Sequence, residues 1–291
     1  MNTNKTMPYD ADEIREIYRV IKIATTHSTW WFRGHTETYK NPLTPKIFRD
    51  EYIPKNVVRP ETESDVIKEF KRVAPALTQN IPNQDDHCNW LFLMQHHGAP
   101  TRLLDWTENA LVALYFAVEN FEDGKDGELW AISPYFLNKE GYGFNEIAIQ
   151  PNEILQYLAT EPYLAIRPAS NNQEKQEKLA EKCGLSEIPQ YPLDLYPTMK
   201  FSRMVAQLST FTIHPIPHQG KNTIPDLLTD KKYLNRYLIP QYYKLNLIND
   251  LKSLGISRRT LFPDLDGLSK TIKDALFHTP SGYNPPNPPE F

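Results

Sequence analysis

Hydrophobic residues recur at helical spacing along much of this chain. In Asp12–Ile23, apolar side chains stand at Ile14, Ile17 and Ile21, which is typical of an amphipathic helix. The segment Asn109–Glu119 is apolar on every side, which predicts a nearly fully buried helix. Similar patterns predict helices over Glu61–Val73 (with Ser64 as its N-cap), Asp85–Gly98, Pro151–Leu158, Thr198–Ala206, Tyr242–Leu254 and Gly267–Phe277.

Other segments have the alternation or the aromatic content of strands. The predicted strands and extended segments are Trp30–Arg33, Glu128–Ser133, Tyr163–Arg167, Tyr191–Pro197, Ser209–Ile213 and Tyr237–Ile239. The charged run Asn171–Lys182 is either a solvated helix or a flexible insertion. Because strands and helices interleave without a regular βαβ rhythm, we expect an α+β fold in which small mixed sheets are flanked by helices.

Composition narrows the class of protein. The chain has 291 residues, of which 40% are hydrophobic and 23% charged, enough apolar material for a core. Its net charge of −4 argues against a generic phosphate-binding surface, but a local basic cleft stays open. Two cysteines make no disulfide framework, and we find neither a signal segment nor an apolar run of membrane-spanning length. We therefore expect a soluble, cytoplasmic protein that does not contact a membrane.

The richest chemistry lies in Gln95–Thr107, a polar stretch between two apolar segments. We interpret it as a loop held by buried elements, where binding groups are commonly presented. Asp105 can hold Arg102 or backbone amides, while Trp106 and Thr107 offer a flat ring and a hydroxyl for a planar ligand. The alternative is that Asp105 or Thr107 caps the helix that follows.

Two further positions have the character of site residues. Arg33 carries a permanent charge whose fork suits phosphate or carboxylate, and Gly34 allows a turn or a close ligand approach. A purely structural pairing of Arg33 with Asp105 is an equally open interpretation. Gln207 stands just before a predicted strand, where it either faces a cleft or simply ends a helix.

Metal and nucleophile chemistry find little support. His87, Cys88, His96 and His97 lack the spacing of a metal site, and Cys88 beside apolar residues is better explained as a small buried residue. Carboxylates are not clustered for Mg²⁺, which disfavours a nuclease. We expect no metal.

Three motifs together resemble the FRG domain family, which is named for its (F/Y)RG motif. They are Phe32-Arg33-Gly34, the Gln95–Thr107 stretch leading into Ala113–Ala117, and Arg203 followed by Gln207, Phe211 and Thr212. The segment Leu261–Gly267 resembles the family's closing stretch. The resemblance covers about residues 30–273, so we expect a single domain over 1–291 with an N-terminal helix in 1–29 and a proline-rich tail at 279–291.

The motif order of this family is similar to that of the ADP-ribosyltransferase superfamily. The resemblance implies an ADP-ribosyltransferase-like core with NAD as substrate, in which Arg33, Thr107 and Gln207 are the catalytic set. It implies cofactor contacts from the residues of the first two motifs, namely Arg33, Gly34, His97, Thr101, Arg102, Asp105, Trp106 and Thr107. Gln207 stands where that superfamily usually has glutamate, and a glutamine side chain is uncharged and cannot act as a general base.

Two hypotheses of different class remain at this stage. The first is an NAD-dependent ADP-ribosyltransferase of a bacterial or phage defence or toxin system, acting on an unknown protein or nucleic acid target and paired with an antitoxin or defence partner. It predicts that Arg33, Thr107 and Gln207 converge on one pocket. The second is a non-catalytic nucleotide-binding or partner-docking module, which predicts that Arg33 is bound to Asp105 with no open cleft between them.

Overall fold

A computed structural model of the protein describes residues 12–49, 60–164, 172–215, 224–228 and 232–277. Within these residues the strands form a single seven-stranded sheet with the order β1-β7-β4-β2-β3-β6-β5. The strands are β1 (Asp12–Glu13), β2 (Trp31–His35), β3 (Leu103–Thr107), β4 (Gly127–Ile132), β5 (Leu193–Leu195), β6 (Ser209–Ile213) and β7 (Leu234–Ile239). The sheet is mixed, because β1 pairs with β7 in parallel and every other pairing is antiparallel.

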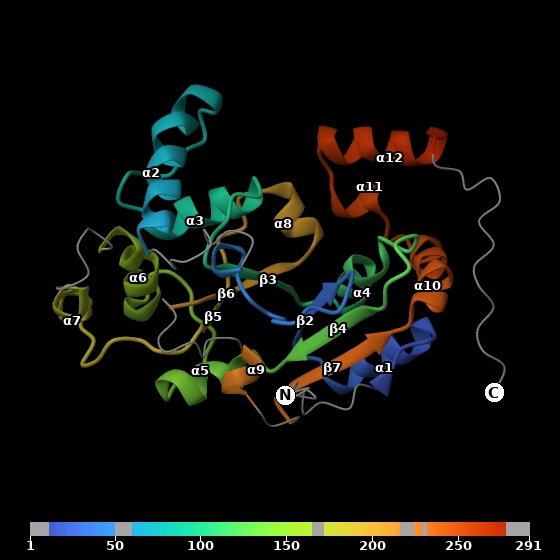
Figure 1. Ribbon diagram of the computed structural model, residues 1–291, viewed down its shortest axis with the longest axis horizontal. Coiled ribbons are helices and arrows are strands. Elements are labelled where there is room, and N and C mark those ends of the chain that lie inside the picture. Colours follow the sequence, from blue (N-terminus) through green and yellow to red (C-terminus); the bar gives the residue numbers. More distant parts are fainter. Residues whose placement is uncertain (1–11, 50–59, 165–171, 216–223, 229–231, 278–291) are drawn as a thin grey trace, which may run out of the picture.

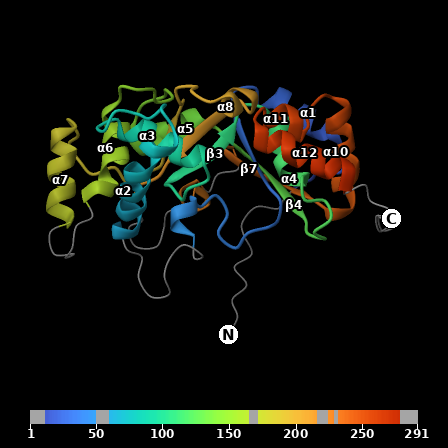
Figure 2. The same cartoon turned by 90° about the horizontal axis from the view of Figure 1, so that it is seen from above.

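Helices gather at both ends of this sheet. They are α1 (Ile17–Thr26), η1 (Lys46–Phe48), α2 (Pro60–Leu77), α3 (His87–His96), α4 (Ala110–Val118), α5 (Pro134–Tyr142), α6 (Glu153–Thr160), η3 (Glu161–Leu164), α7 (Asn172–Lys182), α8 (Ser202–Ala206), α9 (Ile224–Leu227), α10 (Gln241–Ser253), α11 (Arg258–Leu261) and α12 (Leu265–Phe277). Figures 1 and 2 show α2, α3, α6 and α7 around the β5–β6 end, and α1, α10, α11 and α12 at the other end. No helix in the described ranges is both long and apolar enough to cross a membrane.

The two halves of one sheet face bury separate hydrophobic clusters. One cluster joins Phe32 of β2 and Leu129 of β4 to α1, α4 and α10. The other joins Leu103 of β3 and Phe211 of β6 to α3, α6 and α7. The opposite face buries a third cluster, rich in tryptophan, beneath α5 and α9. The seam between the first two clusters therefore falls between β2 and β3, at the centre of the sheet.

Helix α4 lies so close to β2 that a glycine is required there. A Cβ atom on Gly34 would lie 2.0 Å from the carbonyl oxygen of Ala113 and 2.6 Å from the backbone nitrogen of Ala117. Real Cβ atoms do not approach backbone atoms this closely, so any side chain would push α4 away from the strand. Gly34 is thus explained by helix–sheet packing, whether or not a ligand also approaches it.

Most of the helices predicted from periodicity are confirmed, including the buried α4. The charged run Asn171–Lys182 is a helix, which decides between its two interpretations. The N-cap prediction for Ser64 is wrong, because α2 begins four residues earlier and Ser64 lies inside it. The first helix begins only at Ile17, after the short strand β1.

Three strand-level predictions need correction. The expected small sheets are one continuous sheet, because pairing between distant strands leaves no trace in local periodicity. The supposed loop Gln95–Thr107 contains β3, a central strand whose exposed Asp105 interrupted the apolar pattern. Tyr163 and Leu164 belong to η3 and not to a strand, while the rest of that predicted strand and the 279–291 tail lie outside the described residues.

Candidate functional site

The two central strands of the sheet separate at its midpoint. β2 and β3 pair only through Phe32 and Thr107, after which β2 continues along β4 and β3 along β6. Asp105 has no pairing partner on β2, and its carbonyl oxygen instead accepts a hydrogen bond of 2.6 Å from Nη1 of Arg33. A side chain thus takes the place of the sheet pairing at this level, and space opens between the strands.

A cavity of about 350 Å³ occupies this space. Its volume falls at the lower end of the range of small-molecule pockets, roughly 300–1,000 Å³. Four phenylalanine residues in its lining form two contacting pairs, Phe92 with Phe211 and Phe116 with Phe262, which we call the aromatic wall. Arg33, His35 and Arg49 lie at its basic end. This combination of a ring-binding wall and a cationic end suits a ligand that has both a planar ring and an anionic group.

Arg33 is held in place by three contacts. Besides the bond to the Asp105 carbonyl, its Nε donates to Nε2 of His35 at 3.2 Å, and its Nη1 lies 3.6 Å from Oδ2 of Asp105. Its side chain is only 16% exposed. Burial lowers the pKa of Arg33 from its ordinary value and the charge of Asp105 opposes that change, yet an arginine stays protonated at neutral pH. Arg33 is therefore a fixed cation at the cavity.

Behind Arg33, a buried histidine links it to a carboxylate. His35 Nδ1 lies 3.1 Å from Oε2 of Glu128, and burial lowers the pKa of His35 to about 4 despite that hydrogen bond. Since the Arg33 Nε can only donate, His35 Nε2 must accept, and its single proton lies on Nδ1 and is donated to Glu128. His35 is thus neutral at physiological pH and positions Arg33 without adding charge.

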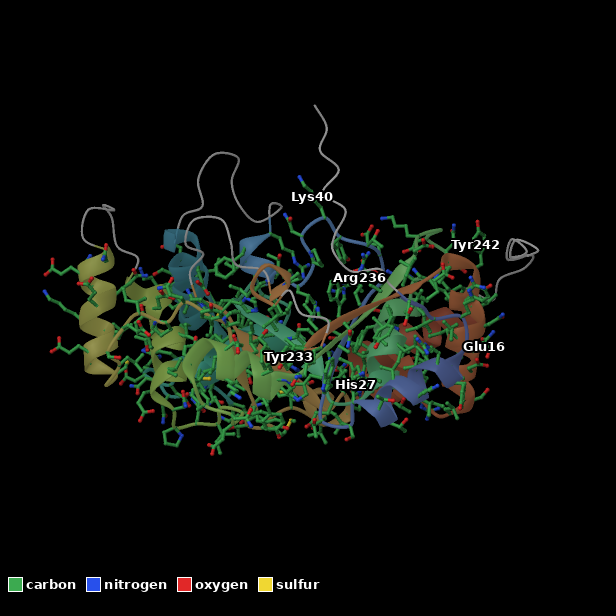
Figure 3. All side chains as sticks on the ribbon, turned by 90° about the horizontal axis from the view of Figure 1, so that it is seen from below. Glu16, His27, Lys40, Tyr233, Arg236 and Tyr242 are labelled. Atoms are coloured by element: carbon green, nitrogen blue, oxygen red, sulfur yellow. The ribbon has the colours of Figure 1, made fainter. Side chains whose placement is uncertain are left out.

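Glu128 completes this arrangement from the neighbouring strand β4. Burial alone would raise the pKa of Glu128, but hydrogen bonds from His35 and Trp130 and the charge of Arg236 lower it overall. Arg236, labelled in Figure 3, reaches Oε1 of Glu128 from β7 at 2.5 Å. Neither His35 nor Glu128 was among the site residues predicted from the sequence. The available signal was a glutamate on the same strand face as Trp130 and Ile132 in an otherwise apolar strand.

Asp105 is oriented from its other side by α3. Gln95 Nε2 donates to Oδ2 of Asp105 at 2.7 Å, and Gln95 Oε1 accepts from Oγ1 of Thr101 at 2.5 Å. The Asp105 side chain stays 53% exposed and borders the cavity. The chain therefore presents a positioned but accessible carboxylate beside Arg33.

Thr107 and Gln207 border the same cavity and are joined to each other. Thr107 Oγ1 donates to the Gln207 carbonyl oxygen at 2.7 Å and accepts from the backbone N–H of Asn109 at 3.0 Å. Gln207 Nε2 donates to the Leu261 carbonyl oxygen at 3.0 Å. Asn109, not Thr107 or Asp105, is the N-cap of α4. Thr107 nonetheless ties β3 to the start of that helix, so its hydroxyl already has a structural task.

Three residues expected to contact a ligand, namely Trp106, His97 and Thr101, have other placements. Trp106 borders the cavity with its strand, but its ring packs in the cluster on the opposite sheet face, and its Nε1 donates to Thr212 Oγ1 at 3.2 Å. Side chains alternate along a strand, so Asp105 and Trp106 cannot both face the same side. His97 is exposed and does not border the cavity, and Thr101 is fully buried beneath Gln95.

Arg102 is the clearest departure from expectation. It is completely buried, with Nη2 at 2.6 Å from Glu63 Oε2 and Nη1 at 2.7 Å from Glu161 Oε2. Nη1 also donates to the carbonyl oxygens of Leu158 and His214. Arg102 thus joins α2, α6 and η3 to the sheet and is not positioned to bind a ligand in the cavity.

The C-terminal segment closes one side of the cavity. Arg203 of α8 contacts Asp264 Oδ2 at 2.5 Å, and its guanidinium lies over the ring of Phe262. Phe262 also meets Phe116 edge-on at 6.0 Å. The segment Leu261–Gly267, singled out in the sequence, therefore supplies part of the aromatic wall. His87, Cys88, His96 and His97 do not gather, and no group of three potential metal ligands is found among the residues that the structure describes.

The signature of the enzyme hypothesis is present, and that of the module hypothesis is present only in part. Arg33, Thr107 and Gln207 converge on one cavity, as the enzyme hypothesis requires. Arg33 also contacts Asp105, as the module hypothesis requires, but an open space borders both residues. The geometry thus establishes a pocket that both Arg33 and Asp105 border.

Comparison with known proteins gives one match. Residues 28–126 match the family model described as the FRG domain, a segment that includes β2, β3 and α4 with Arg33, Asp105 and Thr107. Gln207 lies beyond the matched segment. Searches among curated proteins and among solved structures each found no match. Residues 28–126 are therefore similar to the FRG domain, in agreement with the resemblance of the sequence motifs.

Proposed function

We propose that the cavity between β2 and β3 binds NAD and that the protein is an ADP-ribosyltransferase-like enzyme. The observation that carries the proposal is the convergence of Arg33, Thr107 and Gln207, from three distant segments, on one cavity with a basic end and an aromatic wall. Arg33 suits the diphosphate, and the phenylalanine side chains suit the nicotinamide ring.

The reaction places clear demands on such a pocket. The glycosidic bond between C1′ of the ribose and the nicotinamide nitrogen breaks, and nicotinamide leaves with the bonding electron pair. A nucleophile on the acceptor then donates a lone pair to C1′ and loses its proton. Positive charge develops at the ribose during this step, so a nearby negative group stabilises the transition state.

Asp105 is the best candidate for that negative group. The carboxylates of the described residues that border the cavity are Asp105 and Glu119, and Glu119 is held by Arg258 at 2.5 Å. Asp105 is more than half exposed and is oriented by Gln95. In this proposal Asp105 supplies the charge that Gln207 lacks, while Thr107 and Gln207 keep the pocket in shape through their mutual hydrogen bond.

The alternative function is a nucleotide-binding module without catalysis. It is favoured by one specific observation, namely that the Thr107 hydroxyl and the Gln207 amide N–H are both engaged in framework hydrogen bonds. The family resemblance extends either proposal to a role in bacterial or phage defence, with a protein or nucleic acid target and an antitoxin-like partner.

The decisive experiment follows labelled NAD with the full chain. The experiment compares wild type with Arg33→Gln and with the control Arg72→Gln, which changes an exposed α2 residue paired with Glu69. For each protein it measures NAD binding by calorimetry, nicotinamide release, and label transfer in a host lysate. We expect release or transfer by wild type and control but not by Arg33→Gln. Binding without release favours the module. Absence of NAD binding by the folded wild type refutes the NAD-dependent enzyme, and absence of binding to ADP as well refutes the nucleotide-binding module.

A further inference from the structure

A second arginine, not recognised from the sequence, stands at the basic end of the cavity. Arg49 follows the turn η1 and borders the cavity together with Arg33. The turn is attached to the stretch before β3, since Ile47 N–H donates to the Thr101 carbonyl oxygen at 3.2 Å and Lys46 Nζ donates to that of Gly98 at 2.7 Å. Arg49 is therefore presented from a position anchored to the same stretch that leads into Asp105.

Both arginines keep donors available. The one hydrogen bond of the Arg49 side chain with a described residue runs from Nε to the Thr44 carbonyl oxygen at 3.1 Å, which leaves Nη1 and Nη2 without a described partner. Arg33 uses Nε and Nη1, and its Nη2 likewise has no partner among the residues that the structure describes. Guanidinium groups are strong donors to phosphate oxygens, so these atoms form a set suited to an anion.

The charge balance at this end also favours an anion. The Arg49 charge acts on both Arg33 and His35, so the two guanidinium groups are close enough to repel each other. His35 is neutral and so does not offset the two positive charges. The Asp105 carboxylate lies 3.6 Å from Nη1 of Arg33 and, among the described residues, forms an ion pair with Arg33 only. A ligand carrying two adjacent negative charges relieves this repulsion better than a single carboxylate does.

We propose that Arg33 and Arg49 form a two-armed site for the diphosphate of a nucleotide, with its planar end directed along the aromatic wall toward Gln207. The nucleotide identity of the ligand rests on the proposed function, whereas the affinity for a diphosphate does not. In this arrangement Arg33 is the rigid arm and Arg49 the second arm, which determines preference for a diphosphate over a monophosphate.

The test measures binding of inorganic pyrophosphate, inorganic phosphate, ADP and adenosine to the full chain by calorimetry. The variants are Arg49→Gln, Arg49→Lys and the exposed control Arg72→Gln, each checked by thermal unfolding. Losing charge-assisted hydrogen bonds should weaken ADP and pyrophosphate binding by roughly 10- to 100-fold in Arg49→Gln. Adenosine binding should be unchanged, and Arg49→Lys, which keeps the charge without the fork, should be intermediate.

The outcomes separate this inference from the proposed function. Wild-type affinity of Arg49→Gln for ADP and pyrophosphate, or failure of the folded wild type to bind either compound, overturns the two-armed site. NAD turnover that is unaffected in Arg49→Gln leaves the enzyme standing without this site. Conversely, Arg49-dependent binding of pyrophosphate without any NAD turnover supports the site and refutes the transferase reaction.

Discussion

Replacing Arg102 by methionine tests whether this residue stabilises the fold or binds a ligand. Methionine keeps an unbranched chain of similar length but removes the charge and all donors. Glu63 and Glu161 are 3% and 1% exposed, so the change leaves two carboxylates buried without their cation. Removing one partner from a buried ion pair costs roughly 3–5 kcal/mol.

That cost is large compared with the stability of a typical domain. Domains unfold with free energies of roughly 5–15 kcal/mol, so Arg102→Met should lose about a fifth of the total or more. Arg102 also donates to the carbonyl oxygens of Leu158 and His214, which become unsatisfied in the variant. We therefore expect a loss of stability at the upper end of the range of roughly 3–5 kcal/mol.

The assay is urea unfolding followed by tryptophan fluorescence and far-UV circular dichroism. Arg72→Met is the matched control, because Arg72 forms an exposed pair with Glu69 whose loss should leave the midpoint nearly unchanged. Combining Arg102→Met with Glu63→Gln and Glu161→Gln should recover part of the loss. An Arg102→Met midpoint equal to wild type, accompanied by weaker nucleotide binding, would refute the structural role and restore the ligand role inferred from the sequence.

Three further predictions concern packing and protonation. Gly34→Ala should lower the free energy of unfolding by about 3 kcal/mol, the upper end for overpacking, because the added Cβ would meet the Ala113 carbonyl oxygen. Thermal unfolding measures this loss, and a melting curve like that of wild type would contradict the close packing of α4 on β2. Burial raises the pKa of Asp194 well above its ordinary 3.8, so the folded state keeps this proton and loses stability as the pH rises above 3.8. In urea unfolding, Asp194→Asn should therefore be more stable than wild type at pH 8 and lose this advantage near pH 4. A stability difference that does not depend on pH would argue against this burial. Burial raises the pKa of Cys88 to about 12, so a thiol reagent at pH 8 should modify it only after unfolding, and rapid labelling of the native protein at this residue by mass spectrometry would be inconsistent with that burial.

Local patterns were sufficient where packing follows periodicity. The apolar circumference of α4 specified a buried helix, and the charged run 172–182 was recognised as a possible solvated helix. Arg33, Asp105 and Gln207 were singled out from their residue types and positions, before the family resemblance was considered, and the structure places all three at one cavity. The sequence thus indicated most of the elements and several residues of the site.

Strand pairing and side-chain direction were beyond the reach of the sequence. Asp105 and Trp106 are neighbours in the chain, but alternation along β3 sends one to the cavity and the other into the opposite core. Arg102 looks like its neighbours in sequence, yet its carboxylate partners come from positions 63 and 161. Such contacts depend on where distant segments meet in three dimensions, which no local pattern encodes.

By itself, then, the sequence indicated most of the helices, though not α5, α9 and α11, most of the strands, and several polar residues that border the cavity, because these follow from short-range spacing and residue type. The tertiary structure alone decided that β2 and β3 separate after one residue pair, that Arg49 joins Arg33 there, and that His35 and Glu128 support the pair from behind. The physical reason is that a binding site is made of long-range contacts, and their geometry is fixed only when the whole sheet has assembled.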